Sequence, residues 1–353
     1  MYRNTIYRKE TLQGKVYSEL LRNIVTGKFP PGTPLPSRTE LENEFNAGKE
    51  TIKKVLKKLA ENGYIHPRCR RSALVAKKLP SHHYTIAMPV CVADSLNEFD
   101  YLDSPWGYLI FNSVSVALLQ KGHTMLVLDG KANNGMLPSQ IDGVVMLGDD
   151  QFNYRGNYPD LPILMINPQQ KRALGALTCD FSEAFTKVAV YFLSVGVKHV
   201  LLLGFNAPKR ELLFDYAQNN FVGTLLEQGF DSNNILYGPA ECCYERADAE
   251  MAVSEFLSAA PQGPVCVLAS GDMLAQGAVD AAKKFQRCIK KDFFAVGCTG
   301  LKEVEKWDVP ISTAGTPFEK LGQRAAEMII DYIASGNAPE AEYVKSQFIK
   351  RNS

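Results

Sequence analysis

The sequence of 353 residues lacks the features that mark membrane and secreted proteins. No apolar run approaches the roughly 18 consecutive residues that a membrane-spanning helix needs. The first ten residues, MYRNTIYRKE, contain no apolar stretch of the kind found in secretory signals. We therefore expect a cytoplasmic protein that does not act at a membrane.

The eight cysteines are scattered, and no two of them form a Cys-x-x-Cys pair. In a chain without a secretory signal, isolated cysteines are typically reduced core thiols rather than disulfides or metal ligands. His82 and His83 are adjacent, yet no third metal ligand lies near them in sequence. We expect no metal site and no disulfide framework.

Signatures of common enzyme classes are missing as well. The sequence contains no Gly-x-Gly-x-x-Gly or Gly-x-x-x-x-Gly-Lys-Ser/Thr phosphate loop, no Gly-x-Ser-x-Gly and no His-Glu-x-x-His. We therefore expect no catalytic residues, no cofactor and no enzymatic activity.

Charge is distributed unevenly along a chain whose net charge is only +1. Residues 1–80 contain 17 Lys and Arg against 7 Asp and Glu, whereas residues 81–353 contain 22 against 31. A basic segment attracts a polyanion such as nucleic acid, and an acidic segment is repelled by it. Because the length suits two or three domains, this asymmetry predicts a small nucleic-acid-binding module joined to a larger domain.

The basic region fits three short helices. Apolar residues recur at helical intervals within residues 11–26, which predicts the first helix. Ser37 followed by Glu40 has the pattern of a capping box, so a second helix should begin there and end at a turn over residues 46–48. The core positions of the third helix are Ile52, Val55, Leu56 and Leu59. Its surface carries Lys49, Lys53, Lys54, Lys57 and Lys58.

Two short helices joined by a tight turn, the second with a lysine-rich face, have the layout of a helix-turn-helix. Residues 64–67 and 73–76 suit two strands of a hairpin around the basic residues 68–72, which would form a wing. The third helix would enter the major groove, where some side chains read base edges and others meet phosphates. The alternative is that the lysines form the solvated face of an ordinary helix.

Several segments share the order and spacing of a known DNA-binding domain. They are Lys15-Val16-Tyr17, the run from Gly27 to Ser37, Glu40-Leu41, Thr51-Ile52, Leu56, Leu59 and Gly63-Tyr64-Ile65. Together they resemble the winged helix-turn-helix of the GntR (gluconate repressor) family over about residues 8–78. The resemblance implies operator contacts at Ser37, Arg38, Thr39, Lys49, Glu50, Thr51, Lys53 and, in the wing, Arg70 and Arg71.

The sequence departs from the family pattern at three places, one of which is the third helix, where Lys49 and Lys53 stand at positions that are commonly arginine. The arginine usual on the second helix is displaced to Arg38, with Thr39 in its place. Arg70 and Ser72 stand where the wing of this family usually has glycines. The resemblance therefore implies the groove geometry and leaves the operator sequence and the shape of the wing open.

A polar stretch that contains Pro80 separates this module from the rest of the chain. It ends before Tyr84, where an apolar strand pattern begins. We assign residues 1–79 to a DNA-binding domain, residues 80–84 to a linker and residues 85–353 to an effector-binding and dimerisation domain.

Beyond the linker, short apolar runs alternate with helical stretches. The predicted strands cover residues 85–91, 123–129, 143–147, 162–166, 198–204, 264–269 and 293–297. The predicted helices cover residues 106–120, 182–195, 214–228, 247–260, 272–286 and 317–335. Such alternation predicts an α/β fold with parallel sheets covered on both faces, and the length suits two doubly wound lobes. Ligands of these sheets bind beyond the carboxyl ends of the strands.

A second set of segments occurs in a fixed order along this domain. The set comprises Ser104-Pro105-Trp106, Asp142 to Val145, Pro162 to Asn167, Asp180, Gly196 to Val200, Ala269 to Ala278, Val296-Gly297 and Thr316-Pro317. In this order they resemble the effector domain of the lac/galactose repressor family, which is akin to periplasmic sugar-binding proteins. The resemblance implies a two-lobed, periplasmic-binding-protein-like fold. It places effector contacts at Trp106, Asn167, Tyr244, Gly271-Asp272, Thr299 and Thr316.

The chemistry of these residues suits a sugar, although each has another interpretation. Trp106 and Tyr244 offer apolar faces to a sugar ring, and Asp272 can accept hydrogen bonds from two hydroxyls. Asp272 could instead cap the helix that begins there, Trp106 could belong to the core, and Tyr244 to the surface or core. The arginine usual in this family aligns with Ala217, and its loss argues against an anionic effector.

These features together predict a transcription regulator, and we expect a repressor whose operator is released by a bound sugar or sugar derivative. A homodimer would present two winged helices to two half-sites of double-stranded operator DNA. The ligand would bind between the lobes and prefer one DNA-binding state. Two alternatives stay open: a DNA-binding protein whose large domain only dimerises, and a sugar-modifying enzyme fused to a DNA-binding module.

Overall fold

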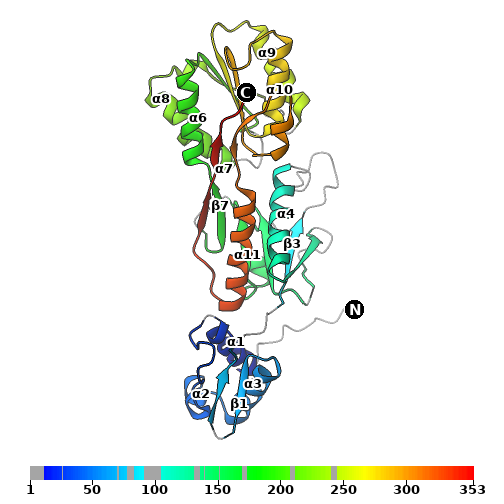
Figure 1. The fold of residues 1–353 in the computed structure, drawn as a ribbon, viewed down its shortest axis with the longest axis vertical. Coiled ribbons are helices and arrows are strands. Elements are labelled where there is room, and N and C mark those ends of the chain that lie inside the picture. Colours follow the sequence, from blue (N-terminus) through cyan, green and yellow to red (C-terminus); the bar gives the residue numbers. More distant parts are fainter. Residues whose placement is uncertain are drawn as a thin grey trace.

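The computed structural model of the chain describes residues 12–25, 27–69, 71–77, 83–90, 105–130, 136–138, 140–150, 152–168, 173–206, 211–239 and 245–353. These residues form three bodies stacked along the long axis of the molecule (Figure 1). A small domain of helices and a hairpin lies at one end, and two α/β lobes follow it. The fold class therefore agrees with the expectation from the sequence.

The N-terminal domain contains three helices and a hairpin. Its elements are α1 (Leu12–Val25), α2 (Arg38–Glu44), α3 (Lys49–Glu61), β1 (Ile65–Arg68) and β2 (Arg71–Val75). They share a core of their own, in which Leu20, Leu41 and Leu59 are fully buried. The three predicted helices are confirmed, and so is the capping box, because the Ser37 hydroxyl accepts a hydrogen bond from the backbone N–H of Glu40.

The turn between the two strands of the hairpin is shorter than the sequence suggested. Arg68 pairs with Arg71 in the antiparallel ladder, and Nε of Arg68 donates to the carbonyl oxygen of Ser72 at 2.8 Å. The predicted strands at residues 64–67 and 73–76 are therefore wrong at the tip, because pairing continues into the basic segment. This hydrogen bond also holds the Arg68 side chain across the hairpin.

Lobe 1 is built, in the described ranges, on a six-stranded parallel sheet. In spatial order its strands are β13 (Glu342–Lys345), β7 (Ala176–Asp180), β6 (Ile163–Ile166), β5 (Gly143–Leu147), β3 (Thr85–Val90) and β4 (Thr124–Asp129). Helices α4 (Pro105–Gln120) and α11 (Phe318–Ser335) pack together and cover one face. The short α5 (Tyr154–Asn157) lies on the other face, where Tyr154 is buried.

Lobe 2 repeats this plan. Within the part of the chain that the structure describes, its sheet has the order β14 (Gln347–Ile349), β12 (Ser312–Gly315), β11 (Phe293–Gly297), β10 (Val265–Ala269), β8 (His199–Leu203) and β9 (Ile235–Tyr237), with β14 antiparallel to β12. Its helices are α6 (Ser182–Ser194), α7 (Glu211–Tyr216), α8 (Gly223–Glu227), α9 (Arg246–Ser258) and α10 (Asp272–Lys284). A π-helical turn over Ala217–Val222 joins α7 to α8.

The strands and helices predicted in the larger domain are present close to their expected bounds, except that the single helix predicted over residues 214–228 is divided into α7, the π-helical turn and α8. Strands β7, β9, β12, β13 and β14 are additional elements that the sequence analysis missed. Strand β12 reads Ser-Thr-Ala-Gly, and β9 and β14 each span three residues. Segments that are so short or that consist of small side chains lack the apolar run by which a strand is identified. Their position is decided by the strands with which they pair in the sheet.

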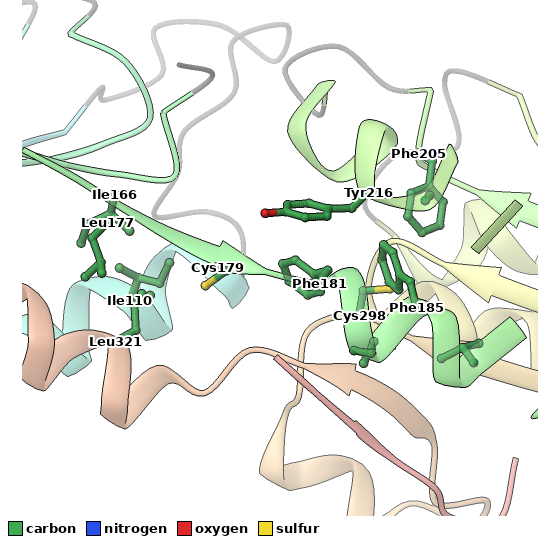
Figure 2. Close-up of a cluster of buried hydrophobic side chains, with 14 of the residues drawn as sticks. Ile110, Ile166, Leu177, Cys179, Phe181, Phe185, Phe205, Tyr216, Cys298 and Leu321 are labelled. Atoms are coloured by element: carbon green, nitrogen blue, oxygen red, sulfur yellow. The ribbon is translucent and has the colours of Figure 1, made fainter. Parts of the chain in front are cut away.

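Within the described residues, the chain passes between the lobes at 180–182, 315–318 and 345–347. As a result, α6 follows a strand of lobe 1 but packs in lobe 2, and α11 does the reverse (Figure 1). One hydrophobic cluster continues through the crossings, from lobe 1 through Phe181 to Phe205 in lobe 2 (Figure 2). Core packing therefore joins the lobes in addition to the chain itself.

The described cysteines are free thiols. Cys179, Cys266 and Cys298 are buried in the lobes, whereas Cys69 and Cys288 are exposed. Among the described residues, no group of three or more metal-ligating side chains occurs. In the same ranges, no helix combines the length and the apolar character that crossing a membrane would require.

Candidate DNA-binding surface and interlobe site

Helix α3 separates an apolar face from a basic one. Ile52, Val55 and Leu59 are fully buried against the neighbouring helices. The exposed lysines on the remaining surface are Lys49, Lys53, Lys54, Lys57 and Lys58. Because the core fixes the apolar face, the lysines point to solvent, where they can meet phosphates or base edges.

Two of these lysines form ion pairs along the same helix. Lys53 lies 3.7 Å from Glu50, and Lys57 lies 3.6 Å from Glu61. All four side chains are more than half exposed. Exposed pairs of this kind contribute roughly 0–1 kcal/mol, so phosphates can compete for both lysines.

The start of α2 presents three of the predicted DNA contacts. Ser37 is its N-cap: the hydroxyl accepts from the N–H of Glu40 at 3.3 Å, and the Glu40 carboxylate accepts from the N–H of Ser37 at 2.7 Å. The hydrogen bond from the Ser37 backbone lowers the pKa of Glu40. Arg38 and Thr39 are exposed beside the cap. The cap determines where α2 begins and leaves Arg38 and Thr39 accessible.

The other predicted DNA contacts lie on α3 and in the hairpin. Glu50 is exposed and Thr51 is half-buried near the start of α3. Arg71 is exposed on β2, whereas Arg70 lies outside the described residues. The fold thus brings the described members of the set to the surface of one small domain.

Asp272 is buried at the first position of α10, and its carboxylate is fully engaged. Oδ1 accepts hydrogen bonds from the N–H of Thr299 at 3.1 Å and the hydroxyl of Thr313 at 2.7 Å. Oδ2 accepts from the N–H groups of Gly300 at 2.8 Å and Leu301 at 2.7 Å. Burial raises the pKa of this carboxyl, while the four donors act in the opposite direction. The side chain therefore holds the loop after β11, and each oxygen already accepts two hydrogen bonds.

The cap of α10 differs from the one considered in the sequence. Gly271 is the N-cap residue, and no side chain caps the helix there. The interpretation of Asp272 as the cap is therefore wrong, because Asp272 lies one residue inside the helix. A Cβ atom at Gly297 would lie 2.2 Å from Oδ1 of Asp272, so the glycine that ends β11 makes room for the carboxylate.

Asn167 and Thr299 also use their polar groups within the protein. Asn167 has a φ of 53°, and its Oδ1 accepts from the N–H of Cys179 at 2.6 Å, which ties the end of β6 to β7. Thr299 is buried, and its hydroxyl accepts from the N–H of Asp272 at 3.3 Å. Tyr244 lies outside the described residues. The two described side chains shape the carboxyl ends of strands in different lobes.

Trp106 reaches from α4 to the crossing at residues 315–318. Its half-buried side chain packs against the central cluster, and Nε1 donates to the hydroxyl of Thr316 at 3.1 Å. The N–H of Thr316 donates in turn to the carbonyl oxygen of Thr299 at 3.1 Å. Trp106 is thereby linked, through Thr316 and Thr299, to Asp272 in lobe 2.

Aromatic residues that the sequence analysis did not single out lie where the lobes meet. Tyr216 ends α7 in lobe 2, and its ring centroid lies 6.0 Å from that of Phe181 at the first crossing. In Figure 2 the Tyr216 hydroxyl points away from Phe205 and toward lobe 1. Burial raises the pKa of Tyr216, and the Asp180 carboxylate adds to the shift. An aromatic residue directly after a strand is the signal that would have identified Phe181, and it was missed together with β7.

The position that aligns with the family's arginine lies in the hydrophobic core. Ala217 is fully buried at the start of the π-helical turn. A longer side chain there would displace core residues, so the fold offers this position no charged group. The next residue, Gln218, donates from its amide to the hydroxyl of Tyr237 on β9. Tyr216, which faces the other lobe, is the residue directly before this π-helical turn, a feature that is frequent at functional sites.

Two protein families match separate parts of the chain. Residues 12–75 match the family described as "Bacterial regulatory proteins, gntR family". Residues 189–353 match the family described as "Periplasmic binding protein-like domain". The matches correspond to the N-terminal domain and to lobe 2 with the final crossings.

Curated relatives share about two thirds of the chain. The HTH-type transcriptional repressor CytR of Escherichia coli (strain K12) is 22% identical over 236 residues, which cover 63% of this chain and 67% of CytR. The HTH-type transcriptional repressor PurR of Erwinia tasmaniensis is 28% identical over 256 residues, which cover 66% of this chain and 71% of PurR.

Solved structures share the architecture. The transcriptional regulator CelR in complex with cellobiose is similar with a TM-score of 0.63 and 18% identity, over 97% of this chain and 99% of CelR. The lac repressor dimer bound to operator and the anti-inducer ONPF is similar with a TM-score of 0.63 and 14% identity, over 77% of this chain and 94% of that chain. We conclude that the chain joins a gntR-type helix-turn-helix domain to a periplasmic-binding-protein-like domain, and that the larger domain has the fold of lac-repressor-type structures.

Proposed function

We propose that this protein is a transcription repressor whose affinity for operator DNA is controlled by a sugar or sugar derivative bound between the two lobes. It acts in the cytoplasm, without enzymatic turnover, as a homodimer that presents two winged helices to two half-sites. The names of its relatives support the regulatory role, and the CelR structure contains cellobiose.

The lysine face of α3 is the observation that carries the proposal. It lies opposite a fully buried stripe, so its side chains are free to approach DNA without disturbing the core. Lysines there neutralise phosphates, and those near the start of the helix can reach base edges. Lys49 and Lys53 occupy that first part of α3 and are the residues that we assign to operator reading.

The effector half of the proposal rests on residues at the crossings. Half-buried Trp106 supplies an aromatic face on which the C–H side of a sugar ring can pack, and the buried rings of Phe181 and Tyr216 belong to the core where the lobes meet. Asp180 accepts from the N–H of Ser182 at 2.9 Å through one oxygen, and in the described ranges its other oxygen accepts no hydrogen bond. That oxygen is suited to a ligand hydroxyl. Asn167, Asp272 and Thr299 contribute by holding the strand ends around the ligand.

Trp106→Ala is expected to raise the effector concentration that gives half-maximal operator release by about 10-fold or more. The substitution removes an aromatic face whose burial against the ligand contributes roughly 1–3 kcal/mol to binding. Operator affinity without effector should stay at the wild-type value. Trp106→Phe keeps a ring and loses the N–H that Thr316 accepts, so it separates packing from hydrogen bonding. Titrations of operator complexes with effector measure this concentration for both variants. If Trp106→Ala releases the operator at the same effector concentration as the wild type, the assignment of Trp106 to the effector site is wrong.

Helix α4 is suited to the homodimer interface. It contains no charged residue, and Tyr108, Val116 and Leu119 are 54%, 43% and 60% exposed. Val127 on the neighbouring edge strand β4 is exposed as well. In a two-fold interface the same surface meets itself, so an uncharged apolar face avoids like-charge repulsion. A second copy of this chain is therefore the occupant that we propose.

Leu119→Glu combined with Val116→Glu is expected to convert the dimer to a monomer, because four carboxylates would meet in the interface. Operator affinity should then fall by about 10-fold or more, since the two half-sites are no longer bound by one linked pair. Sedimentation velocity and operator titration measure the two effects. Val190→Glu on α6, at a residue 54% exposed, is the matched control and should remain a dimer. A dimeric double variant would place the interface elsewhere.

The function as a whole is tested in two steps. A thermal-shift screen against neutral sugars, sugar acids and sugar phosphates finds the effector, because a ligand of the native state raises its stability. Operator fragments selected from random DNA are then titrated with and without that ligand. A stabilising ligand that lowers operator affinity is the expected result. Failure to select any DNA, or a ligand that leaves operator affinity unchanged, would contradict the proposal.

A further inference from the structure

Helix α11 spans lobe 1 from the lobe boundary to the N-terminal domain. It begins directly after the crossing at residues 315–318 and ends at Ser335, followed by Gly336 with a φ of 68°. At its far end α11 contacts α1 of the N-terminal domain (Figure 1). One helix therefore reaches both the place where the lobes meet and the domain that carries α3.

The first end of α11 is tied to lobe 2. Thr316, just before the helix, accepts a hydrogen bond from Trp106 at 3.1 Å and donates its N–H to Thr299 at 3.1 Å. Thr299 belongs to the loop that the buried carboxylate of Asp272 holds. A change in the position of lobe 2 relative to lobe 1 therefore acts directly on the start of α11.

The middle of α11 is packed tightly against the rest of lobe 1. A Cβ atom at Gly322 would lie 2.4 Å from the carbonyl carbon of Ser113, so α11 and α4 are in backbone contact there. Nε of Arg324 donates to Glu342 on β13 at 2.6 Å. Close packing of this kind transmits displacements rather than absorbing them.

The N-terminal domain is attached at the same end of lobe 1 by a second point. Nδ1 of His83, the residue before Tyr84, lies 2.6 Å from the carbonyl oxygen of Gly122, and the N–H of Tyr84 donates to Nδ1 of His123 at 3.1 Å. The end of the predicted linker is thus held by the turn that follows α4. The N-terminal domain therefore meets this end of lobe 1 through the chain at residues 83–84 and through the contact between α1 and α11.

We propose that the contact between α1 and α11 transmits the effector signal to α3. This inference rests on the proposed function and adds the route of its regulation. Because α1 and α3 share one buried core, a displacement at the end of α11 moves the lysine face as a unit. The lobe arrangement that the effector prefers and the one that the operator prefers then differ in the position of α1.

Ala334→Arg tests the contact, because this residue is half-buried in the last turn of α11. Gln323→Arg adds the same charge at an exposed position in the middle of the helix and is the matched control. Hydrogen exchange of the full-length protein, read on peptides covering residues 12–25, should be several-fold faster in Ala334→Arg and unchanged in Gln323→Arg. If Ala334→Arg does not fold, Asp331→Arg, exposed near the same end, replaces it.

The second readout is the ratio of operator affinities without and with the effector found by thermal shift. We expect it to fall from the roughly 5- to 150-fold of a typical allosteric effector toward 1-fold in Ala334→Arg, with effector affinity retained. Unchanged exchange in α1, or a wild-type ratio despite faster exchange, overturns the proposal. If the wild-type protein selects no operator, the proposed function fails, whereas the exchange measurement still decides whether α1 and α11 are docked.

Discussion

The double substitution Lys49→Ala and Lys53→Ala is expected to weaken operator binding by about 30-fold or more. A base-edge contact contributes roughly 1–3 kcal/mol to binding. Each lost phosphate contact reduces the magnitude of the slope of log affinity against log salt concentration by about 1. Both side chains are exposed, and alanine favours helix, so the variant should fold as the wild type does. Fluorescence anisotropy with labelled operator over a series of salt concentrations measures affinity and slope together.

The matched control removes two lysines from lobe 2. Lys302 and Lys306 are exposed on a short 3-10 helix there, and replacing both with alanine changes net charge by the same amount. Operator binding by this control should stay within about 3-fold of wild type, since surface charges beyond the Debye length are screened. If the α3 variant also binds like wild type, the assignment of α3 to the major groove is wrong.

Asp272→Ala is expected to destabilise the protein by at least about 3 kcal/mol. The substitution leaves four donors without the carboxylate that accepts them, and each buried unsatisfied group costs roughly 1–3 kcal/mol. For lobes of this size, the midpoint of thermal unfolding should fall by roughly 6 °C or more. Differential scanning calorimetry measures the shift, and the affected transition should be that of the two lobes, which share one hydrophobic cluster.

Asp308→Ala is the control for this substitution. Asp308 is 86% exposed and pairs with Lys283, so solvent screens the pair and its loss should leave the unfolding midpoint close to that of the wild type. The outcome that would contradict the structural role of Asp272 is a variant of wild-type stability that no longer binds the effector. Such a result would show that the carboxylate contacts the ligand directly.

The N-terminal domain was predictable because its signals are local. The helical repeat of α1, the Ser37–Glu40 capping box and the lysine face of α3 each lie within a few residues of sequence. The tip of the wing was not predictable, because Arg68 and Arg71 carry no apolar pattern and pair only through the ladder of the neighbouring strand. Local propensity decides helices and caps, whereas the length of a hairpin depends on its register.

In the lobes, too, some elements were predictable from local sequence and others depend on pairing with distant segments. Apolar strands such as β10 and β11 were visible as continuous runs, because both faces of a parallel sheet are buried. Strands β12 and β14 consist of few or small residues; β12 forms because it pairs with β11, and β14 forms because it pairs with β12. The two crossings that use β12, β13 and β14 were therefore hidden, and with them the way α11 enters lobe 1.

For the interlobe site, the sequence indicated residue types and the structure decided their roles. Asp272 was a reasonable ligand contact, yet its donors Thr299 and Thr313 lie 27 and 41 residues away and occupy the carboxylate. Trp106 meets Thr316 across 210 residues, a distance over which no spacing rule applies. Tyr216 was overlooked because its importance comes from facing Phe181 in the other part of the fold.

The sequence by itself determined the two-part organisation, the helix-turn-helix, the basic face of α3 and the α/β class of the larger domain. Each of these follows from the period of apolar residues or the distribution of charge, which are properties of neighbouring positions. Only the tertiary structure decided which polar groups are already satisfied, which aromatic residues face each other between the lobes, and that α11 connects the lobe boundary to α1. Those properties arise from contacts between segments far apart in the chain. Buried hydrogen-bond donors pair with their acceptors only when folding brings those segments together.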